Sequence, residues 1–363
     1  MSIPRIFIAA TRQNVGKTMF SLGCLGYLSR IKKQVGYIKP VGQRTVLVEN
    51  IQVDEDSLLM ERVFGIKDNL EDMNPIRVGK GFTAECIRKD CTAQLSEQII
   101  NAYKRIEKNK DIVIIEGTGH AGVGSVLGLS NAKVAKLLDA SVVMVAPGGI
   151  GRPIDEVALN LELLRKEGVA LAGVVINKVK IEKYDQIKEL VIPGLKKMGI
   201  KVLGILPYEK ILSAPTVQEI LEEVEGELLN TVSEEKMSVA VQHNLVGAMS
   251  VHQSMNYFKL GSLIITPGDR EDIILAALGM NIKQPKMVAG IILTGQAMPH
   301  SNILDLFLQT QIPVIKCNKD TYTVASCIHD LMAKISPEEK YKIEYAIRAV
   351  NQQVDFSQIF QGI

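Results

Sequence analysis

The chain has 363 residues, with 47% hydrophobic side chains and 42 basic against 40 acidic ones. This composition excludes a disordered protein, and the length is comfortable for two domains. The net charge of +2 argues against nucleic acid or an anionic membrane as a partner, and no apolar run approaches the roughly 20 residues that span a bilayer. The N-terminus shows no export signal and the five scattered cysteines form no zinc motif, so we expect reduced thiols in a cytoplasmic protein.

The N-terminal segment has the layout of a phosphate-binding loop. An apolar run, Arg5–Ala9, leads into a polar loop that ends in Gly16-Lys17-Thr18, and a helix-compatible stretch from Met19 to Ile31 follows. In such a loop, backbone N–H groups surround a phosphate, the lysine reaches the β- and γ-phosphates, and the threonine hydroxyl ligates Mg²⁺. Thr11 occupies the first glycine position of the strict pattern, so an ordinary strand-turn-helix is the alternative. We predict that ATP and Mg²⁺ bind here, with the nucleotide held by Asn14, Val15, Gly16, Lys17, Thr18 and Met19.

Several short β-branched runs precede helix-like stretches, which is typical of βαβ units in a parallel sheet. Their near-continuous valine and isoleucine content indicates strands that are buried on both faces. The sequence therefore predicts an α/β fold, a P-loop parallel sheet with helices on both faces. Its expected strands are Arg5–Ala9, Gln34–Ile38, Asp111–Ile115, Ser141–Ala146, Ala172–Ile176 and Lys201–Leu206.

A second, smaller α/β domain is predicted to follow, and a C-terminal helix after it. The expected domain boundaries are 1–212, 213–335 and, for the C-terminal helix and tail, 336–363. The strands expected in the second domain are Ser262–Thr266, Val288–Thr294 and Val314–Lys316.

Capping patterns predict where three helices of this part begin. Thr216, with Glu219 three residues later, is the expected N-cap of a helix over Val217–Leu229. Asp269 is placed to cap a helix over Glu271–Leu278, with Asp272 at its third position. In the last helix, Ser336 is the expected N-cap and Pro337 the first residue, with Tyr341, Tyr345, Ile347 and Val350 available for packing.

Polar residues stand at the carboxyl ends of the predicted strands, where ligands of open parallel sheets sit. Glu116 and Asn177 each end a strand, and Lys39, held extended by Pro40, should project its amine beyond the sheet edge. Asp54 and Asp56 open a helix after the second strand. Because Mg²⁺ takes oxygen ligands, we predict a metal site made of Thr18, Glu116 and Asp56, with Asp54 as the alternative. The helix dipole alone also favours acids in a first turn, so the two aspartates have a purely structural explanation as well.

The segment Gly117-Thr-Gly119-His-Ala-Gly122 matches the G-x-G-x-x-G pattern of dinucleotide-binding folds. The acid about 20 residues on, Asp139, precedes a strand instead of ending one, and Glu116 would repel a pyrophosphate. We therefore interpret the glycines as a flexible loop beside a phosphate or substrate. His120 then either faces the site or is solvated.

Together these segments resemble the dethiobiotin synthetase and cobyrinate diamide synthase family of P-loop proteins over roughly residues 1–210. The matching motifs are Ala10-Thr-Arg-Gln-Asn-Val-Gly-Lys-Thr18, Tyr37-Ile-Lys39-Pro40, Asp56-Ser-Leu, Ile115-Glu116-Gly117 and Val175-Ile-Asn177-Lys178. The resemblance implies Lys17 and Lys39 on phosphate or substrate and Asn177 near the adenine. It also implies Thr18, Asp56 and Glu116 around Mg²⁺, so that Lys17, Lys39 and Glu116 are the expected catalytic residues.

Residues from Pro215 to about Asp330 resemble a DRTGG domain, through Ala248-Met-Ser, Gly261-Ser-Leu-Ile-Ile-Thr-Pro-Gly-Asp-Arg270 and Leu293-Thr-Gly295. The combination is similar to the N-terminal portion of some long bacterial phosphate acetyltransferases. The chain stops without the acetyl-transferring domain, so we do not expect a complete phosphate acetyltransferase.

Two functions are compatible with these features. The first is an ATP- and Mg²⁺-binding regulator or ATPase, a homodimer or larger homo-oligomer, whose DRTGG domain senses a small metabolite or a partner. The second is an ATP-dependent ligase that activates a carboxylate, or a carbamate held by Lys39. Arg12 and Gln13 replace the acid and threonine that synthetases of this family place beside the substrate, and Gly119-His120 replaces their paired glycine. Both departures argue against dethiobiotin synthesis specifically and leave nucleotide binding untouched. The altered Arg12-Gln13 and the appended domain favour the first function.

Overall fold

The computed structural model describes residues 3–48, 50–331 and 333–360. The chain divides into two compact units. The first combines Met1–Tyr208 with Ile335–Ile363, and the second is Glu209–Lys334. The C-terminal helix therefore belongs to the first unit, although residues 361–363 of the predicted tail lie outside the described part. No helix among the described residues is long and apolar enough to cross a membrane.

The first unit is built on a six-stranded sheet in which all neighbouring strands are parallel. Its central strands carry almost only buried apolar side chains, as expected for a sheet covered on both faces. The strand order reverses at β1, which lies between β7 and β8. In spatial order the strands are β10 (Val202–Pro207), β9 (Leu171–Val179), β8 (Ser141–Pro147), β1 (Arg5–Ala10), β7 (Ile112–His120) and β2 (Val35–Ile38).

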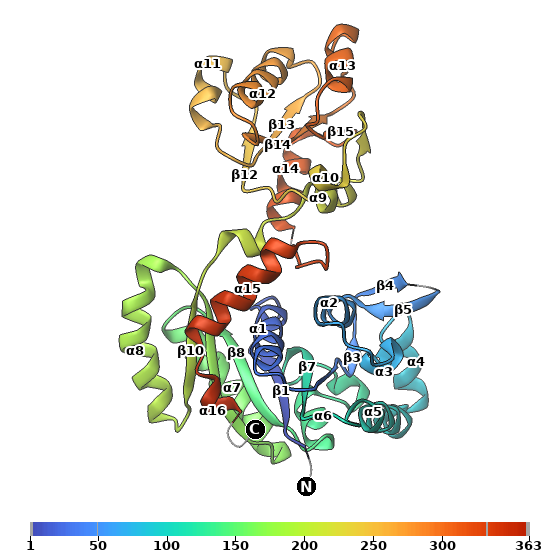
Figure 1. Ribbon diagram of the computed structural model, residues 1–363, viewed down its shortest axis with the longest axis vertical. Helices are drawn as coiled ribbons and strands as arrows, with labels where there is room; N and C mark the ends of the chain where they lie inside the picture. Colours follow the sequence, from blue (N-terminus) through green and yellow to red (C-terminus); the bar gives the residue numbers. More distant parts are fainter. Residues whose placement is uncertain (1–2, 49, 332, 361–363) are drawn as a thin grey trace. The chain divides into compact units, whose positions relative to one another are not determined.

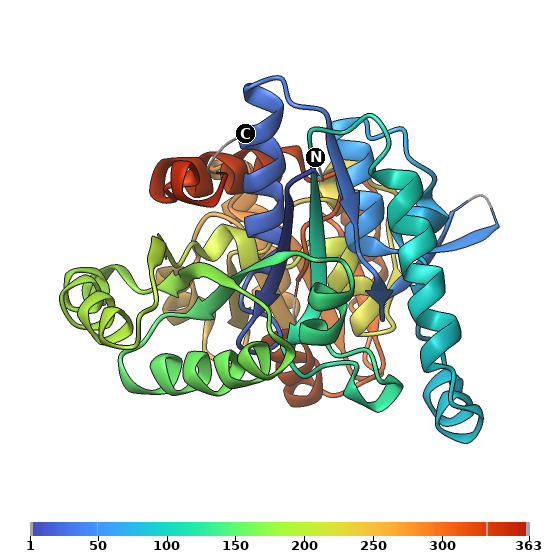
Figure 2. The same ribbon diagram turned by 90° about the horizontal axis from the view of Figure 1, so that it is seen from below.

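Helices cover both faces of this sheet (Figures 1 and 2). Helix α1 and the C-terminal α15 lie against each other on one face, and α7 lies on the other (Figure 2, blue, red and green). This confirms the predicted α/β class with helices on both faces. The main helices are α1 (Lys17–Arg30), α2 (Glu55–Phe64), α5 (Thr92–Ile106), α6 (Asn131–Leu137), α7 (Gly151–Glu167), α8 (Tyr184–Lys197), α15 (Lys340–Gln353) and α16 (Phe356–Ile359).

Between β2 and α5 the chain forms small elements that the sequence did not predict. A hairpin of two antiparallel strands, β4 (Thr45–Val48) and β5 (Ile51–Asp54), leads directly into α2. Asn50 adopts a left-handed conformation at its turn, φ 67°. The hairpin returns the chain to the sheet, so Asp54 and Asp56 come back beside Lys39. The other elements here are β3 (Val41–Gly42), α3 (Leu70–Met73), β6 (Ile76–Arg77) and α4 (Phe82–Lys89).

The second unit is a smaller α/β layer structure with a five-stranded sheet. Its strand order is β11 (Glu227–Leu228), β15 (Val314–Cys317), β14 (Val288–Thr294), β13 (Ser262–Pro267) and β12 (His243–Val246), with only β11 antiparallel. One apolar core lies under α12 (Glu271–Lys283) and α13 (Ser301–Leu308). The other lies under α9 (Val217–Glu223) and α14 (Thr321–Asp330). Two further helical turns are α10 (Glu234–Met237) and α11 (Val251–Ser254).

The three helix starts predicted from capping patterns had different outcomes. The capping box of Thr216 and Glu219 is present, but α9 ends at Glu223 and the chain continues into β11. The prediction that Asp269 caps α12 is wrong, because the N-cap residue is Arg270. The Arg270 guanidinium does not cap the helix; it donates hydrogen bonds to the backbone carbonyls of Gly247 and Met249.

The start predicted for the C-terminal helix is also wrong. Ser336-Pro337-Glu338 forms a turn, and α15 begins at Lys340. Tyr341 is exposed, whereas Val350 is buried as expected.

Candidate functional site

The loop between β1 and α1 has the backbone of a phosphate cradle. Asn14 and Gly16 both adopt left-handed conformations, with φ of 59° and 96°. Gly16 is the N-cap residue of α1 and supplies no side-chain cap, and the first turn contains no acidic residue. The positive end of the helix dipole is therefore not compensated by the helix itself, which is the arrangement that favours a bound phosphate.

Strand β9 supports one side of the loop. The Asn177 side chain donates a hydrogen bond from Nδ2 to the Val15 carbonyl over 2.8 Å, and Lys178 donates from Nζ to the Asn14 carbonyl over 2.7 Å. Asn177 is buried, and its Oδ1 accepts from the Lys178 backbone N–H. Burial and the positive charge of Arg12 lower the pKa of the Lys178 ammonium. The contact of Asn177 with adenine stays a prediction; its present hydrogen bonds hold the loop.

Helix α7 supports the other side through two residues that the sequence did not single out. Asn160 donates from Nδ2 to the Thr11 carbonyl over 3.2 Å, and Glu156 accepts a hydrogen bond of 3.0 Å from the Thr11 hydroxyl. Thr11, which breaks the strict loop pattern, is thus buried and hydrogen-bonded at the loop entrance. An isolated asparagine and glutamate on an amphipathic helix carry no sequence signal that would have revealed this support.

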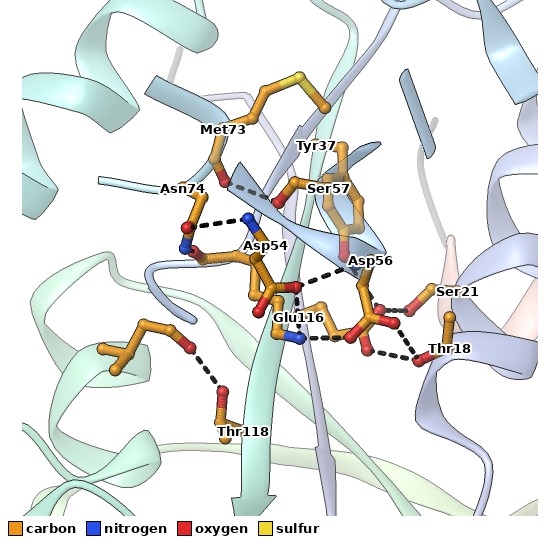
Figure 3. A network of polar contacts seen from close by, with 12 residues as sticks. Thr18, Ser21, Tyr37, Asp54, Asp56, Ser57, Met73, Asn74, Glu116 and Thr118 are labelled. Atoms are coloured by element: carbon orange, nitrogen blue, oxygen red, sulfur yellow. Dashed lines mark hydrogen bonds and ion pairs between the residues drawn. The ribbon is translucent and has the colours of Figure 1, made fainter. Parts of the chain in front are cut away.

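The predicted metal residues converge on the first turn of α1 (Figure 3). The Thr18 hydroxyl lies 3.1 Å from Asp56 Oδ1 and 3.1 Å from Glu116 Oε1. A hydroxyl has one proton, so it can donate to only one of these carboxylates at a time. Asp54 is the N-cap residue of α2, and its side chain accepts a hydrogen bond from the backbone N–H of Asp56. Of the two aspartates, Asp56 is the one whose carboxylate lies within hydrogen-bond distance of Thr18. This geometry favours Asp56 over Asp54 as a metal ligand.

Glu116 lies on β7 with only 1% of its surface exposed. Besides Thr18, its carboxylate accepts hydrogen bonds from the Ser21 hydroxyl at 2.5 Å and the Tyr37 hydroxyl at 3.1 Å. Burial, and secondarily the negative charge of Asp56, raise the pKa of the Glu116 carboxyl. Ser21 and Tyr37 stand within apolar runs of the sequence, and nothing in these runs predicts that they bond Glu116.

Lys39 directly follows β2, and its ammonium is buried against carboxylates instead of being open to a ligand. Its Nζ donates to Asp54 Oδ1 over 2.7 Å and to Asp56 Oδ2, and the residue is 5% exposed. Burial alone would lower the pKa of this ammonium, but the charges of Asp56 and Asp54 outweigh burial and raise it. The returning hairpin is the physical reason, because it brings both aspartates onto the lysine.

The balance of buried charge in this network suits a divalent cation. Asp54, Asp56 and Glu116 supply three buried carboxylates, and Lys39 is the buried cation that faces them. Among the described residues, no three His, Cys, Asp or Glu side chains form a ready-made metal site. Mg²⁺ commonly takes one or two protein carboxylates together with water and substrate phosphates. The Thr18 hydroxyl and these carboxylates are oxygen ligands of the kind that Mg²⁺ takes, so the residues fit this cation.

The glycine pattern after Glu116 is not the flexible loop that was predicted. Gly117 to His120 continue strand β7, and the Asn131 side chain bonds the carbonyls of Thr118 and His120 over 2.8 Å and 2.7 Å. His120 is exposed and accepts the Gly122 N–H on Nδ1. Gly117 to His120 are therefore the carboxyl end of a strand, and Ala121 and Gly122 begin the turn that follows it.

Comparison with known proteins agrees with this architecture. The profile of the family described as "AAA domain" matches residues 4–216, which is more than half of the chain. The profile described as "DRTGG domain" matches residues 219–331. A solved structure, the MinD cell division protein of Aquifex aeolicus, is 15% identical and covers 58% of this chain and 84% of that one. Its TM-score is 0.38.

Curated relatives match nearly the whole chain. The phosphate acetyltransferase of Nitratidesulfovibrio vulgaris is 27% identical over 98% of this chain and 51% of its own length, and that of Pseudomonas putida gives the same values. The chain spans about half the length of these relatives, as expected for a counterpart of their N-terminal portion. The chain belongs to the P-loop family described by the AAA-domain profile, with a DRTGG domain following the P-loop domain.

Proposed function

We propose that this protein binds ATP with Mg²⁺ in its first unit and hydrolyses it under the control of its DRTGG domain. The observation that carries the proposal is the Thr18 hydroxyl, held 3.1 Å from both Asp56 and Glu116 directly after Gly16 and Lys17. A nucleotide phosphate at the start of α1 and a cation beside Thr18 would compensate the helix dipole and the buried carboxylates together.

Each residue has a distinct task in this proposal. Lys17 would pair with the β- and γ-phosphates, and Thr18, Asp56 and Glu116 would hold Mg²⁺ directly or through water. Mg²⁺ would supply positive charge at the phosphates. Lys39 would keep Asp54 and Asp56 in place. Asn14 and Val15, whose carbonyls are tied to β9, would present the loop N–H groups to the phosphates.

The ligase alternative receives less support from this geometry. It requires Lys39 to act on a substrate carbamate or on the γ-phosphate, yet the ammonium is already engaged by two carboxylates. Transfer of an acetyl group is the activity in the names of the curated relatives, of which this chain spans about half. We therefore do not extend that activity to this chain.

Calorimetry of ATP binding in Mg²⁺ and in EDTA tests the proposal. Lys17→Ala should weaken binding at least tenfold, because it leaves phosphate charge uncompensated, a loss of about 2–4 kcal/mol. The exposed Lys188 on α8 provides the matched control, and Lys188→Ala should bind as the unmodified chain does. Equal ATP affinity of the Lys17 and Lys188 variants would overturn the assignment of Lys17 to the phosphates.

A turnover assay separates the two functions. A burst of ATP turnover with one carboxylate metabolite, and none without it, would favour the ligase.

A further inference from the structure

The C-terminal helix packs on the phosphate-loop helix through two glycines. An ideal Cβ on Gly23 would lie 2.3 Å from Val350 Cγ1, and one on Gly26 would lie 2.5 Å from Ile347 Cγ2. Gly23 and Gly26 are three residues apart and lie on one face of α1. Because any side chain there would overlap α15, the two helices approach closely only with glycine at these positions.

Polar and aromatic contacts extend this interface. Asn351 donates from Nδ2 to the Gly23 carbonyl over 3.0 Å, in addition to a hydrogen bond within α15. At the far end of α1, the ring of Tyr27 stacks on Phe356, with ring centroids 4.4 Å apart. The backbone N–H of Asp355 donates to Leu203 on the edge strand β10. The segment is thus fixed to both α1 and the sheet.

The same segment also reaches α2. Glu338 accepts a hydrogen bond of 2.9 Å from Arg62 Nη1 near the end of that helix, although both side chains are about half exposed and the pair is weak. Helix α1 begins with Lys17 and Thr18, and α2 follows its N-cap Asp54. The C-terminal segment therefore contacts the two helices whose first turns carry the residues of the candidate site.

We propose that α15 is a positioning element for the Mg²⁺–nucleotide site, holding α1 so that Thr18 lies between Asp56 and Glu116. This inference rests on the proposed function, because it concerns the same site. The chain enters α15 only a few residues after the second unit ends at Lys334. The seating of α15 on α1 is therefore a physical means by which that unit can act on nucleotide binding.

The test exchanges side chains across the glycine contact in the full chain. Gly23→Ala should push α15 away, and Val350→Gly added to it should restore the contact by removing the opposing side chain, whose Cγ1 and Cβ lie nearest. Alanine forms helices better than glycine, so a loss in Gly23→Ala must come from the contact. Gly279→Ala on α12 is the control, since nothing lies within 4 Å of its Cβ position.

Two readouts separate positioning from simple stabilisation. The ratio of ATP affinity in Mg²⁺ to that in EDTA should fall about fivefold or more in Gly23→Ala and recover in the exchange variant. Hydrogen exchange of the α1 amides, measured without nucleotide, should be faster in the single variant only. If Gly23→Ala does not fold, Asn351→Ala provides a milder change in the same direction, with an expected fall of about twofold.

An unchanged affinity ratio would overturn the inference, even where exchange is faster, because α15 would then only stabilise the unit. If the unmodified chain binds no ATP in either buffer, the proposed function fails first. In that case the exchange measurement still decides whether α15 holds α1.

Discussion

The side-chain amide of Asn177 occupies the space that a side chain on Gly16 would need. An ideal Cβ on Gly16 would lie 2.2 Å from Asn177 Nδ2, which donates to the Val15 carbonyl. Gly16 also has a φ of 96°, a conformation that L side chains rarely adopt. Glycine is thus required here for two separable reasons, backbone conformation and the close approach of β9.

Gly16→Ala should therefore lose nucleotide binding through displacement of Asn177 and of the loop. Backbone strain alone is expected to lower the free energy of unfolding by about 1–2 kcal/mol. Gly81→Ala measures the cost of backbone strain alone, because Gly81 has a φ of 86° but no atom within 4 Å of its Cβ position. Calorimetry should show ATP affinity lost in the first variant and kept in the second. Retained affinity in both would mean that the contact with Asn177 does not shape the site.

Glu116 links the pH dependence of stability to the cation. Its folded-state pKa is raised above the ordinary 4.5, so the protonated form favours the fold. This contribution is complete below pH 4.5 and is lost as the pH rises through the raised value, because the buried carboxylate then ionises. In EDTA, the free energy of unfolding of the unmodified chain should fall as the pH rises through this pKa, and that of Glu116→Gln should fall less.

The same variant should lose at least about tenfold of the Mg²⁺ enhancement of ATP affinity, since glutamine keeps the shape but not the charge. Thermal unfolding in EDTA between pH 4.5 and 8, with calorimetry of Mg²⁺–ATP, gives both results. Glu97→Gln, on the exposed face of α5, should change neither. A Glu116→Gln chain with a normal Mg²⁺ effect would remove Glu116 from the metal site.

Much of the P-loop unit follows from sequence because its signals are local. The strands are β-branched runs, and Gly16-Lys17-Thr18 stands between a strand and a helix, so the convergence of Thr18 and Glu116 follows from parallel-sheet topology. The hairpin of β4 and β5 has no such isolated signal. Without it, Lys39 is expected to face a ligand, whereas in the structure it faces Asp54 and Asp56.

Other features depend on contacts between distant parts of the chain. Gly23 and Gly26 look like weak points of a helix until Val350 and Ile347 are placed against them. The end of α9 at Glu223 reflects pairing of β11 with β15, nearly 90 residues later in the sequence, which overrides local helix propensity. Long-range packing of this kind leaves no periodic pattern in one sequence.

Lys39→Met should destabilise the protein by about 3–5 kcal/mol, because it leaves two buried carboxylates without their ammonium. Adding Asp54→Asn removes one of the carboxylates and should recover part of the loss, so the two changes are coupled. Chemical unfolding of both single variants and the double variant measures this coupling. Lys188→Met provides the exposed control. A stable Lys39→Met chain that keeps its ATP affinity but loses turnover dependent on a carboxylate metabolite would instead support the ligase alternative.

The place of α15 in the first unit changes what an isolated nucleotide-binding unit must contain. A chain that ends near residue 212 lacks α15 and exposes the glycine face of α1 to water. A chain in which a flexible glycine-serine linker replaces residues 209–334 keeps α15. We expect the linker chain to unfold cooperatively and bind ATP, and the truncated chain to unfold at lower temperature and bind ATP more weakly.

Comparing ATP hydrolysis by the linker chain with that by the full chain then measures the influence of the DRTGG domain, for which couplings of about 1–3 kcal/mol are typical. Equal hydrolysis by both, under every metabolite tried, would contradict control by the DRTGG domain, and equal stability of the truncated chain would contradict the role of α15.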